Sequence, residues 1–325
     1  MKGERTSLKV AVLGCGRWGT FLAWYTSRVG HEVYLWGRRD SRSFKQLKEE
    51  RQNEYLRLPE DVCLSTSLEL VLESDFIVIS ISSQSLRQFT QQIAGYHPRG
   101  KTFILCMKGI ESSTGKRLSQ VFGEEIGTSC STAVWLGPGH VQDFVSGTPN
   151  CMVIGSEDID TTKTIVEEFG SDLIRFYYGQ DLIGNEIGAA AKNVMGVAAG
   201  MLDGLDCSSL KGALMARGAR EISRLVRAMG GNELTVYGLS HLGDYEATLF
   251  SPHSHNRRFG EAFVRGQRFD KLAEGVETVR ALRILSHRHE LELPICNAIH
   301  SILFEDKEAK DELLDLFLRP LKFEF

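Results

Sequence analysis

Several features of membrane, secreted and nucleic-acid-binding proteins are missing from this sequence of 325 residues. No apolar run approaches the roughly 18 residues of a membrane span, so we expect no membrane-spanning helix. Met1 to Leu8 is polar and lacks the apolar stretch of a signal peptide, which predicts that none is present. The net charge of −4 gives no reason to expect binding to nucleic acid or to an acidic membrane surface.

The cysteines are scattered along the chain. The seven cysteines are odd in number, and no two of them form a C-x-x-C pair. Reduced thiols in a cytoplasmic protein therefore fit better than a disulfide framework. Histidine pairs at positions 253/255 and 287/289 have no cysteine or carboxylate support at zinc-like spacing, so we expect no metal site.

A glycine-rich turn near the N-terminus is the most informative motif that is present. Gly14, Gly16 and Gly19 stand in G-x-G-x-x-G spacing between an apolar strand pattern and a helix pattern. The first glycine permits a tight turn, the second lets a pyrophosphate approach the backbone, and the third lets the helix pack closely on the strand. The phosphates would lie at the positive end of the new helix. This context predicts a Rossmann-type dinucleotide-binding fold.

Strand and helix patterns alternate along the first half of the chain. We expect strands at 10–13, 31–36, 75–81, 102–106, 133–136, 150–154 and 173–177, with helices at 18–29, 40–54, 85–93 and one ending at 169. Repeated strand–helix–strand order is typical of an α/β protein with a doubly wound sheet and right-handed crossovers. The dinucleotide-binding domain is therefore predicted to span residues 1–180.

Strand patterns disappear after about residue 180. Helices are expected at 181–202, 208–229, 261–266, 275–289, 294–304 and 309–318. This predicts an all-helical C-terminal domain over residues 181–325, which would bind the substrate. No flexible linker separates the two domains, so we expect the site in a cleft between them, over the carboxyl ends of the strands.

Polar residues occur at positions that suit chemistry. Lys108 and Gly137 follow strands directly, where Rossmann-type folds bind their ligands. Lys192 and Asn193 interrupt a helix of small apolar residues, and Asp244 supplies a carboxylate further along the chain. An ammonium on an apolar helix is desolvated, and desolvation lowers its pKa toward neutrality.

Each of these residues also has an ordinary structural interpretation. Lys108 could be a solvated loop charge, and Lys192 could extend along the helix to reach solvent. Asp244 could cap a helix, and Arg257 with Arg258 could be a basic pair on the surface. These alternatives remain open from the residues alone.

In combination, however, the motifs resemble the soluble NAD(P)-dependent glycerol-3-phosphate dehydrogenases of bacterial type. The similarity runs nearly from end to end. Its motifs are G-x-G-x-W-G-T at 14–20, Leu35-Trp36, Lys108-Gly109, Gly137-Pro138, Lys192-Asn193, Arg217-Gly218, Gly243-Asp244, Asn256 to Gly260, and Glu274-Gly275. Any one of these would be weak, but together and in this order they are specific.

The resemblance implies reversible hydride transfer between NAD(P)H and dihydroxyacetone phosphate, giving sn-glycerol 3-phosphate for phospholipid synthesis. By matching position, Lys192 would be the general acid and base, Asp244 would pair with it, and Lys108 would polarise the carbonyl or hold the substrate. The implied substrate-binding residues are Lys108, Gly137, Lys192, Asn193, Asp244, Thr248, Ser254, His255, Asn256 and Arg257. The implied cofactor-binding residues are Gly14, Gly16, Arg17, Trp18, Gly19, Arg38, Arg39, Lys108, Val141 and Glu274.

One departure from the family pattern concerns the substrate phosphate. The family usually reads Ser-Arg-Asn where this chain reads Ser254-His255-Asn256. Histidine is shorter than arginine, cannot bind bidentately and is largely neutral at pH 7. Either Arg257 or Arg258 compensates, or phosphate affinity is lower, or the substrate differs. Departures at Ser82, Ser209 and Asn297 concern shape more than chemistry.

The choice between NAD and NADP depends on the end of the second strand. NAD-selective sites usually offer a carboxylate there for the ribose hydroxyls, whereas this chain has Gly37, Arg38 and Arg39. Asp40 comes late enough to cap the next helix. Guanidinium groups attract the extra phosphate of NADP, so NADPH is expected to serve at least as well as NADH.

Two other functions remain open beside this dehydrogenase. One is a related two-domain dehydrogenase acting on another small phosphorylated or carboxylated hydroxy compound. The other is a family member that has lost catalysis and senses the cofactor. The apolar helical domain also makes a homodimer plausible.

Overall fold

The computed structural model describes residues 7–316, 318–320 and 323, so the first six residues of the polar N-terminal segment lie outside it. The chain divides into two compact units. Unit 1 comprises Met1–Met107 and Arg117–Leu182, and unit 2 comprises Lys108–Lys116 and Ile183–Phe325. The sequence-based division at residue 180 placed residues 108–116 in the first domain. They belong instead to the helical unit, because Ile110 is fully buried in its core.

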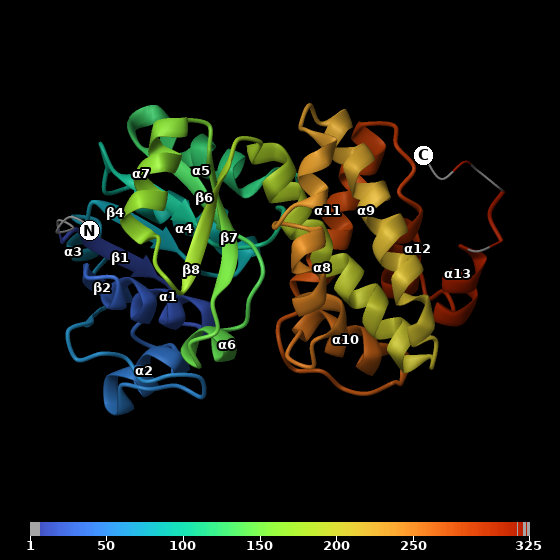
Figure 1. The fold of residues 1–325 in the computed structure, drawn as a ribbon, viewed down its shortest axis with the longest axis horizontal. Coiled ribbons are helices and arrows are strands. Elements are labelled where there is room, and N and C mark those ends of the chain that lie inside the picture. The colour runs from blue at the N-terminus through green and yellow to red at the C-terminus, as the bar shows by residue number, and fades with distance from the viewer. Residues whose placement is uncertain (1–6, 317, 321–322, 324–325) are drawn as a thin grey trace. The chain divides into compact units, whose positions relative to one another are not determined.

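Unit 1 is built on one eight-stranded sheet (Figure 1). Its strands are β1 (Lys9–Leu13), β2 (Glu32–Trp36), β3 (Cys63–Ser65), β4 (Phe76–Ile79), β5 (Thr102–Leu105), β6 (Ser131–Leu136), β7 (Asn150–Ser156) and β8 (Ile174–Gly179), in the order β3-β2-β1-β4-β5-β6-β7-β8. The strands from β3 to β6 are parallel, with Leu13 opposite Trp36 in β2 and Ile79 in β4. The order reverses after β1, which confirms the doubly wound α/β fold.

The last two strands run against the others. β7 pairs antiparallel with β6, and β8 is parallel to β7. Sequence alternation alone did not reveal this reversal. The connection between β6 and β7 contains only a five-residue helix, α6 (Val141–Val145), instead of the longer crossover helix that usually joins parallel strands.

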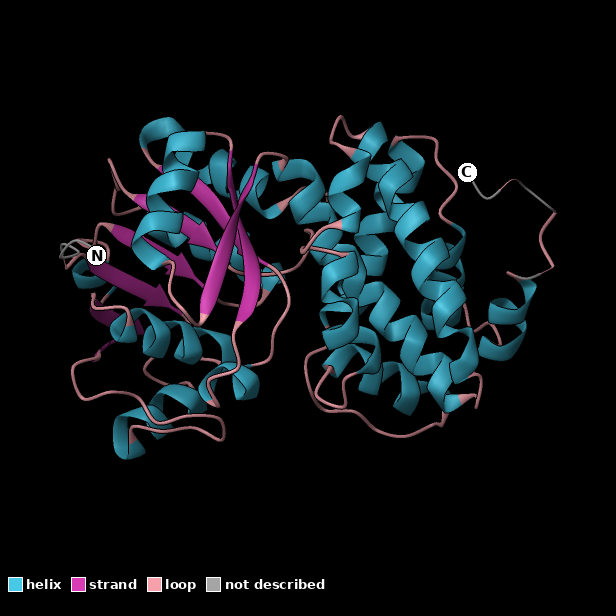
Figure 2. Ribbon diagram, viewed as in Figure 1, coloured by secondary structure: helices cyan, strands magenta, loops and turns pink. Residues whose placement is uncertain are grey.

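Helices cover both faces of the sheet (Figure 2). They are α1 (Arg17–Arg28), α2 (Arg42–Glu50), α3 (Leu68–Val71), α4 (Leu86–Ala94), α5 (Leu118–Ile126), α6 and α7 (Ile159–Phe169), with short 3₁₀ turns η1 (Ser83–Ser85) and η2 (Gly127–Ser129). One core joins α1, α6 and α7 to the sheet residues of one face, Val10 and Val12 among them. On the other face Phe103 of β5 meets Phe122 of α5, with ring centroids 4.7 Å apart.

Some boundaries differ from the expected ones. The helix expected at 40–54 is the shorter α2, and its N-cap is Ser41, whose Oγ accepts a hydrogen bond from Phe44 N at 3.2 Å. The proposed cap Asp40 is therefore wrong, because the helix begins one residue later. The elements β3, α3, α5 and α6 had no counterpart in the sequence analysis, since all four are short or weakly patterned.

Unit 2 is helical. Its helices are α8 (Leu182–Gly204, whose first residue belongs to unit 1), α9 (Lys211–Ala228), α10 (His255–Val264), α11 (Glu274–Arg288), α12 (Pro294–Phe304) and α13 (Ala309–Asp315). Short turns are η3 (Ser208–Leu210), η4 (Glu233–Tyr237), η5 (Leu242–Asp244) and a π-helical turn, η6 (Glu246–Phe250). α10 begins six residues before the predicted start. The helix expected at 309–318 ends earlier, and residue 317 lies outside the described residues.

The central element of this unit is α8, which is buried along nearly its whole length. Its small residues let neighbouring helices approach closely. A Cβ on Gly200 would stand 1.8 Å from the carbonyl oxygen of Arg257, so α10 can contact α8 only at glycine. Among the described residues, no helix combines the length and apolarity of a membrane span.

Candidate functional site

The turn between β1 and α1 has the geometry of a phosphate-binding loop. Gly14 has φ +118°, and a Cβ there would lie 2.1 Å from the carbonyl oxygen of Ser80. A Cβ on Gly19 would lie 1.8 Å from the Gly14 carbonyl oxygen. Gly16 faces open space and caps α1 without a side-chain hydrogen bond. The first backbone N–H groups of α1 are thus left for an anion, which fits the pyrophosphate of a dinucleotide.

The arginines at the end of β2 lie beside this turn. Gly14 N donates to Trp36 O at 3.0 Å, which fixes the two strand ends together. Arg38 and Arg39 follow at once, and both side chains are exposed. Asp40 is also exposed. The polar groups expected to select the cofactor therefore stand next to the loop expected to bind its phosphates.

Three other predicted cofactor residues lie on the same side of unit 1. The Arg17 guanidinium stands over the ring of Tyr55, 4.9 Å from its centroid, and donates to Gln142 Oε1 at 2.8 Å. Burial lowers the pKa of Arg17. Trp18 packs on Phe21, and Val141 is fully buried as the first residue of α6. Gly137, a predicted substrate residue, follows β6 with φ +130°.

Unit 2 brings four predicted residues into one cluster, named the catalytic cluster after the role predicted for its lysines: Lys108, Lys192, Asp244 and Thr248. Both lysines contact the same carboxylate oxygen: Asp244 Oδ2 lies 2.6 Å from Lys108 Nζ and 2.9 Å from Lys192 Nζ. Lys192 also donates to Thr248 Oγ1 at 2.7 Å. The carboxylate is almost fully buried, whereas the Lys108 side chain remains 21% exposed.

Two ammonium groups share one carboxylate, and this determines the electrostatics of the catalytic cluster. Burial lowers the pKa of Lys192 to about 8, because it penalises the charged form. The nearby charge of Lys108 lowers it further, and Asp244 opposes both effects. A lysine with this pKa holds its proton at neutral pH and releases it under mildly basic conditions.

The two predicted asparagines support the cluster. Asn193 Nδ2 donates to the carbonyl oxygen of Lys108 at 2.9 Å, which holds the Lys108 segment against α8. Asn193 Oδ1 accepts from Asn256 Nδ2 at 3.0 Å, and Asn256 Oδ1 accepts from Gly275 N at 2.9 Å. Glu274 immediately precedes Gly275 at the start of α11. The amide chain therefore ties α8, α10 and α11 together around Lys108.

Sequence reasoning missed a buried histidine beside the cluster. His241 Nδ1 lies 2.7 Å from the Gly188 carbonyl oxygen and must donate to it, since a carbonyl only accepts. Its Nε2 then accepts from the Tyr245 hydroxyl at 2.6 Å. Burial lowers the pKa of His241 to about 4, so it stays neutral. Its place three residues before Asp244 was the one available signal.

The predicted phosphate residues at the start of α10 separate into two groups. Ser254 caps the helix by accepting from Arg257 N, and Arg257 forms ion pairs with Asp203 at 2.8 Å and Glu261 at 3.0 Å. Arg257 is thus engaged within the protein. His255 and the exposed Arg258 instead flank Phe269: the His255 ring centroid is 6.3 Å and the Arg258 Cζ 5.9 Å from that ring.

Comparison with known proteins assigns the family. Two family models match in sequence: the N-terminal domain of NAD-dependent glycerol-3-phosphate dehydrogenase over residues 9–162, and its C-terminal domain over residues 181–314. The glycerol-3-phosphate dehydrogenase (NAD(P)+) of Chlorobium limicola is 38% identical over 98% of this chain and 99% of its own. The chain belongs to this dehydrogenase family.

Other relatives of the family agree. The enzyme of the same name from Thermoanaerobacter sp. is 34% identical over 98% of this chain and 99% of its own. The crystal structure of glycerol-3-phosphate dehydrogenase from Coxiella burnetii has a TM-score of 0.89 at 28% identity, covering 96% of this chain and 99% of that one.

The fold alone is shared more widely. A ketopantoate reductase from Ralstonia eutropha has a TM-score of 0.60 at 14% identity, covering 93% of this chain and 99% of that one. The architecture therefore does not by itself select a substrate. Membership of the family rests on the higher identity of the glycerol-3-phosphate dehydrogenases.

Proposed function

We propose that this protein is an oxidoreductase that interconverts dihydroxyacetone phosphate and sn-glycerol 3-phosphate with NAD(P)H or NAD(P)+. The observation that carries the proposal is the Lys108–Asp244–Lys192 triad in a chain of this family. When bound, the nicotinamide cofactor supplies the hydride in reduction and accepts it in oxidation. The product, glycerol 3-phosphate, suits a role in phospholipid synthesis.

Lys192 is the proposed acid and base. A carbonyl that receives hydride becomes an alkoxide, which must gain a proton as charge develops on oxygen. With a pKa of about 8, Lys192 Nζ is protonated about ten to one at pH 7 and can donate that proton. In the reverse direction the neutral amine removes the proton from the hydroxyl.

The other members of the catalytic cluster orient the Lys192 ammonium and influence its protonation. Asp244 and Thr248 accept from Lys192 Nζ, so two of its three donor sites are directed by the protein and one remains for substrate oxygen. Lys108 is also held by Asp244, with its Nζ 2.6 Å from the same carboxylate oxygen. We assign Lys108 to polarising the substrate oxygen.

The substrate phosphate needs cationic donors, and Arg257 is already engaged in ion pairs. Arg258 is exposed, and it stands on Phe269 together with His255. Of the two arginines considered as replacements for the family arginine, Arg258 therefore fits better. A guanidinium supplies the bidentate contact to phosphate that imidazole cannot.

A turnover assay tests the proposed function. Dihydroxyacetone phosphate is supplied with NADH and with NADPH, and cofactor oxidation is followed together with formation of glycerol 3-phosphate. Turnover is expected with both cofactors. Cofactor binding without turnover would indicate a sensor, and turnover only with other phosphorylated or carboxylated ketones would indicate a related dehydrogenase.

The finer cofactor preference is tested separately at Arg38 and Arg39. Wild-type protein is expected to use NADPH at least as well as NADH. Replacing both arginines by Ala should raise the KM for NADPH by about tenfold or more and change that for NADH little, because only NADPH carries the extra phosphate. Asp40→Asn, at the neighbouring exposed residue, is the control. Equal losses for the two cofactors would remove the selecting role.

A homodimer in the cytoplasm is the proposed setting. Leu234 and Tyr237 lie close together in η4 of unit 2 and are 67% and 42% exposed, which suits a partner subunit. All seven cysteines are free thiols, as in a reducing compartment. Sedimentation of wild type and of Leu234→Lys tests the dimer, and fractionation of cells tests the compartment.

A further inference from the structure

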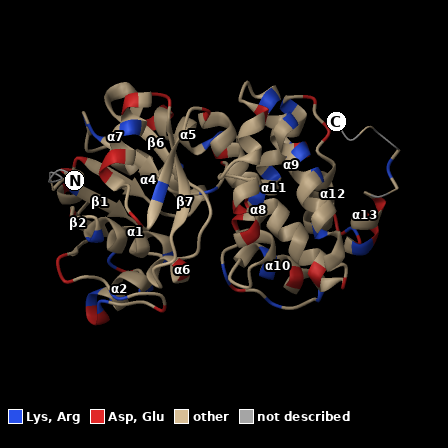
Figure 3. Cartoon of the chain, in the orientation of Figure 1, with Lys and Arg blue, Asp and Glu red and all other residues tan. Residues whose placement is uncertain are grey.

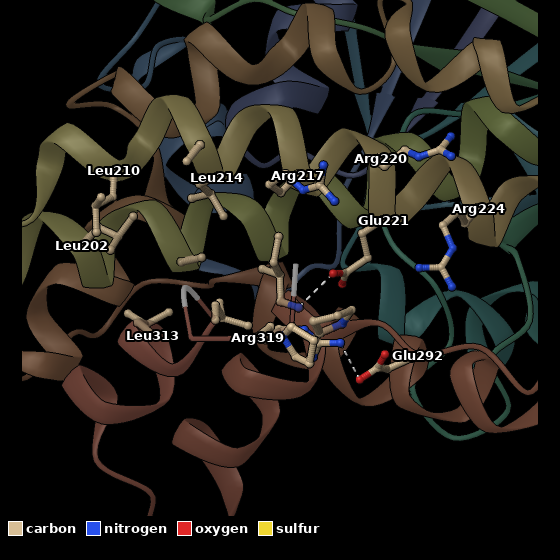
Figure 4. A pocket seen from close by; sticks show the side chains of 16 residues that line it. Leu202, Leu210, Leu214, Arg217, Arg220, Glu221, Arg224, Glu292, Leu313 and Arg319 are labelled. Carbon is tan, nitrogen blue, oxygen red and sulfur yellow. Dashed lines mark hydrogen bonds and ion pairs between the residues drawn. The ribbon is translucent and has the colours of Figure 1, made fainter. Parts of the chain in front are cut away.

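Arg217 belongs to a family-like motif, yet the proposed catalytic site makes no use of it. Its side chain lines a cavity of about 530 Å³ inside unit 2 (Figure 4). The wall is formed by α8, α9, the start of α12 and the segment around α13. No member of the catalytic cluster lines this cavity, so it is a separate place in the same unit.

The cavity has an apolar end and a charged end. Figure 4 shows Leu202, Leu210, Leu214 and Leu313 on one side, with Arg220, Arg224 and Glu292 toward the other. The cause lies in the sequence of α9. Arginines at 217, 220 and 224 are spaced three and four apart and share one helix face, while leucines occupy the turns before them.

The charges of the lining are not balanced. Four arginines line the cavity against two glutamates. Glu221 accepts from the backbone N–H groups of Ile295 and Cys296 at 2.8 and 3.0 Å, and Glu292 pairs with Arg319 at 2.7 Å. Both carboxylates thus have partners. Arg217 and Arg224 form no ion pair with any residue that the structure describes. Figure 3 shows basic residues along α9 in a chain whose charges are otherwise mixed.

We propose that this cavity binds a single-chain amphiphile with an anionic head, a phosphate or a carboxylate. Guanidinium groups bind both heads bidentately, and Arg217 with Arg224 offers two of them. The leucine end removes the chain from water. The volume lies within the roughly 300–1,000 Å³ of small-molecule sites, which admits one chain of moderate length.

Calorimetric titration of the full-length protein with decyl phosphate, below its micelle-forming concentration, tests the proposal. Saturating glycerol 3-phosphate is present so that the catalytic site is occupied. One site per chain is expected. Inorganic phosphate and decanol, which each lack one half of the probe, should bind at least about tenfold more weakly. Decanoate is titrated in the same way to compare a carboxylate head with a phosphate head. Binding of either amphiphile supports the proposed site.

Variants connect binding to the cavity. Arg217→Gln with Arg224→Gln should weaken decyl phosphate by about tenfold or more, since the head loses both guanidinium groups. Ala213→Trp, which fills the cavity without changing charge, should abolish binding. Arg227→Gln is the matched control, because Arg227 lies on α9 with its side chain 75% exposed and outside the lining. Circular dichroism confirms that each variant is folded.

Three outcomes would overturn the proposal. They are wild-type affinity in the double arginine variant, equal weakening in Arg227→Gln, and binding seen only above the micelle-forming concentration. A fourth is a change of oligomeric state in Ala213→Trp, which would mean that a second copy of the chain covers the cavity. Since the readout is the affinity of a probe, failure of the proposed reaction would leave these results interpretable.

Discussion

Unit 2 contains two buried lysines, Lys192 and Lys211, whose immediate surroundings are nearly identical. Lys192 and Lys108 share Oδ2 of Asp244, at 2.9 and 2.6 Å. Lys211 and Arg257 share Oδ2 of Asp203, at 2.6 and 2.8 Å. The Lys192 and Lys211 side chains are 9% and 8% exposed. Burial and pairing therefore do not distinguish the two places.

The difference lies in how each group of charges is shared. In the second group, the Asp203 cluster, Lys211 also donates to the Leu249 carbonyl oxygen, Ser208 donates to Asp203, and Arg257 pairs with Glu261. Two cations face two carboxylates there. In the catalytic cluster both ammonium groups contact one oxygen of Asp244, and burial lowers the pKa of Lys192 to about 8.

A buried ammonium with a lowered pKa costs stability and leaves capacity for chemistry. The Asp203 cluster holds η3, α9, α10 and the end of α8 in place and has no need of a ligand. The catalytic cluster would gain from an electron-rich oxygen at Lys192 and Lys108, which is what a carbonyl becoming an alkoxide provides. The lowered pKa of Lys192 thus indicates the site where burial and pairing alone do not.

The largest expected effect is on kcat, when Lys192 and Lys211 are each replaced by Met. Lys192→Met should lower kcat by about a hundredfold or more with cofactor binding nearly intact, because the proton donor is lost. Lys211→Met should retain most of the kcat per folded molecule. Steady-state kinetics with cofactor titration measure both. Near-normal turnover in Lys192→Met would refute the assignment, and an equal loss in Lys211→Met would remove the contrast.

The same two exchanges should affect stability differently: Lys211→Met should lower it, and Lys192→Met should not. Lys211→Met removes a partner of buried Asp203 and the Leu249 carbonyl, which costs about 1–3 kcal/mol in the free energy of unfolding. Lys192→Met should stabilise the protein at pH 7. The pKa of Lys192 is lower in the folded state than in the unfolded state, so its protonated form opposes folding.

Denaturant unfolding measures both changes. The stabilisation by Lys192→Met should be full below pH 8 and fade as pH rises above it, since the wild-type lysine then deprotonates in the folded state. Lys163→Met, at a lysine 52% exposed, is the control and should change little. A destabilised Lys192→Met would contradict the proposed cost of this charge.

The pH dependence of kcat/KM separates the two groups of charges further. Reduction should decline as pH rises through about 8, where Lys192 loses its proton, and oxidation should rise through the same range. His241, with a pKa of about 4, stays neutral throughout. Lys108→Met should move the midpoint upward, because the Lys108 charge lowers the pKa of Lys192.

Carboxylate variants supply the matched comparison. Asp244→Asn should move the midpoint downward, since Asp244 favours the charged lysine, and Asp203→Asn should leave it in place. Although burial acts to raise it, hydrogen bonds from Lys211, Ser208 and Arg257 lower the pKa of Asp203. The stability that Asp203 contributes is therefore present at neutral pH and lost as pH falls below about 4. A midpoint shifted by Asp203→Asn would show that the two groups are coupled.

Much of the fold followed from local patterns. The glycine turn, the apolar strands and α8 have strong periodicity or special backbone needs, which a sequence displays directly. The antiparallel β7 and the short β3, α3 and α6 do not. Strand direction depends on which elements pack together across the sheet, and short elements are stabilised by tertiary contacts more than by propensity.

The candidate site divides in the same way. Lys192 was conspicuous because a lysine interrupts an apolar helix. Arg257 shows why charge and motif were insufficient to predict a contact with substrate. It was assigned to the substrate, yet it pairs with Asp203, which is remote in sequence, and with Glu261 on its own helix. His241 became visible only through the contact of its Nδ1 with Gly188. Partners distant in sequence determine which polar residues remain available.

The smallest expected effect concerns the start of α10. His255 and Arg257 are two residues apart, but Arg257 is held by the Asp203 cluster while His255 flanks Phe269. His255→Arg should lower the KM for dihydroxyacetone phosphate by about three- to tenfold, or about 1 kcal/mol, because a second guanidinium joins Arg258. Arg257→Gln should instead lower stability and leave the KM of the folded fraction unchanged. A KM that responds to Arg257→Gln and not to His255→Arg would transfer the phosphate contact to the Asp203 cluster.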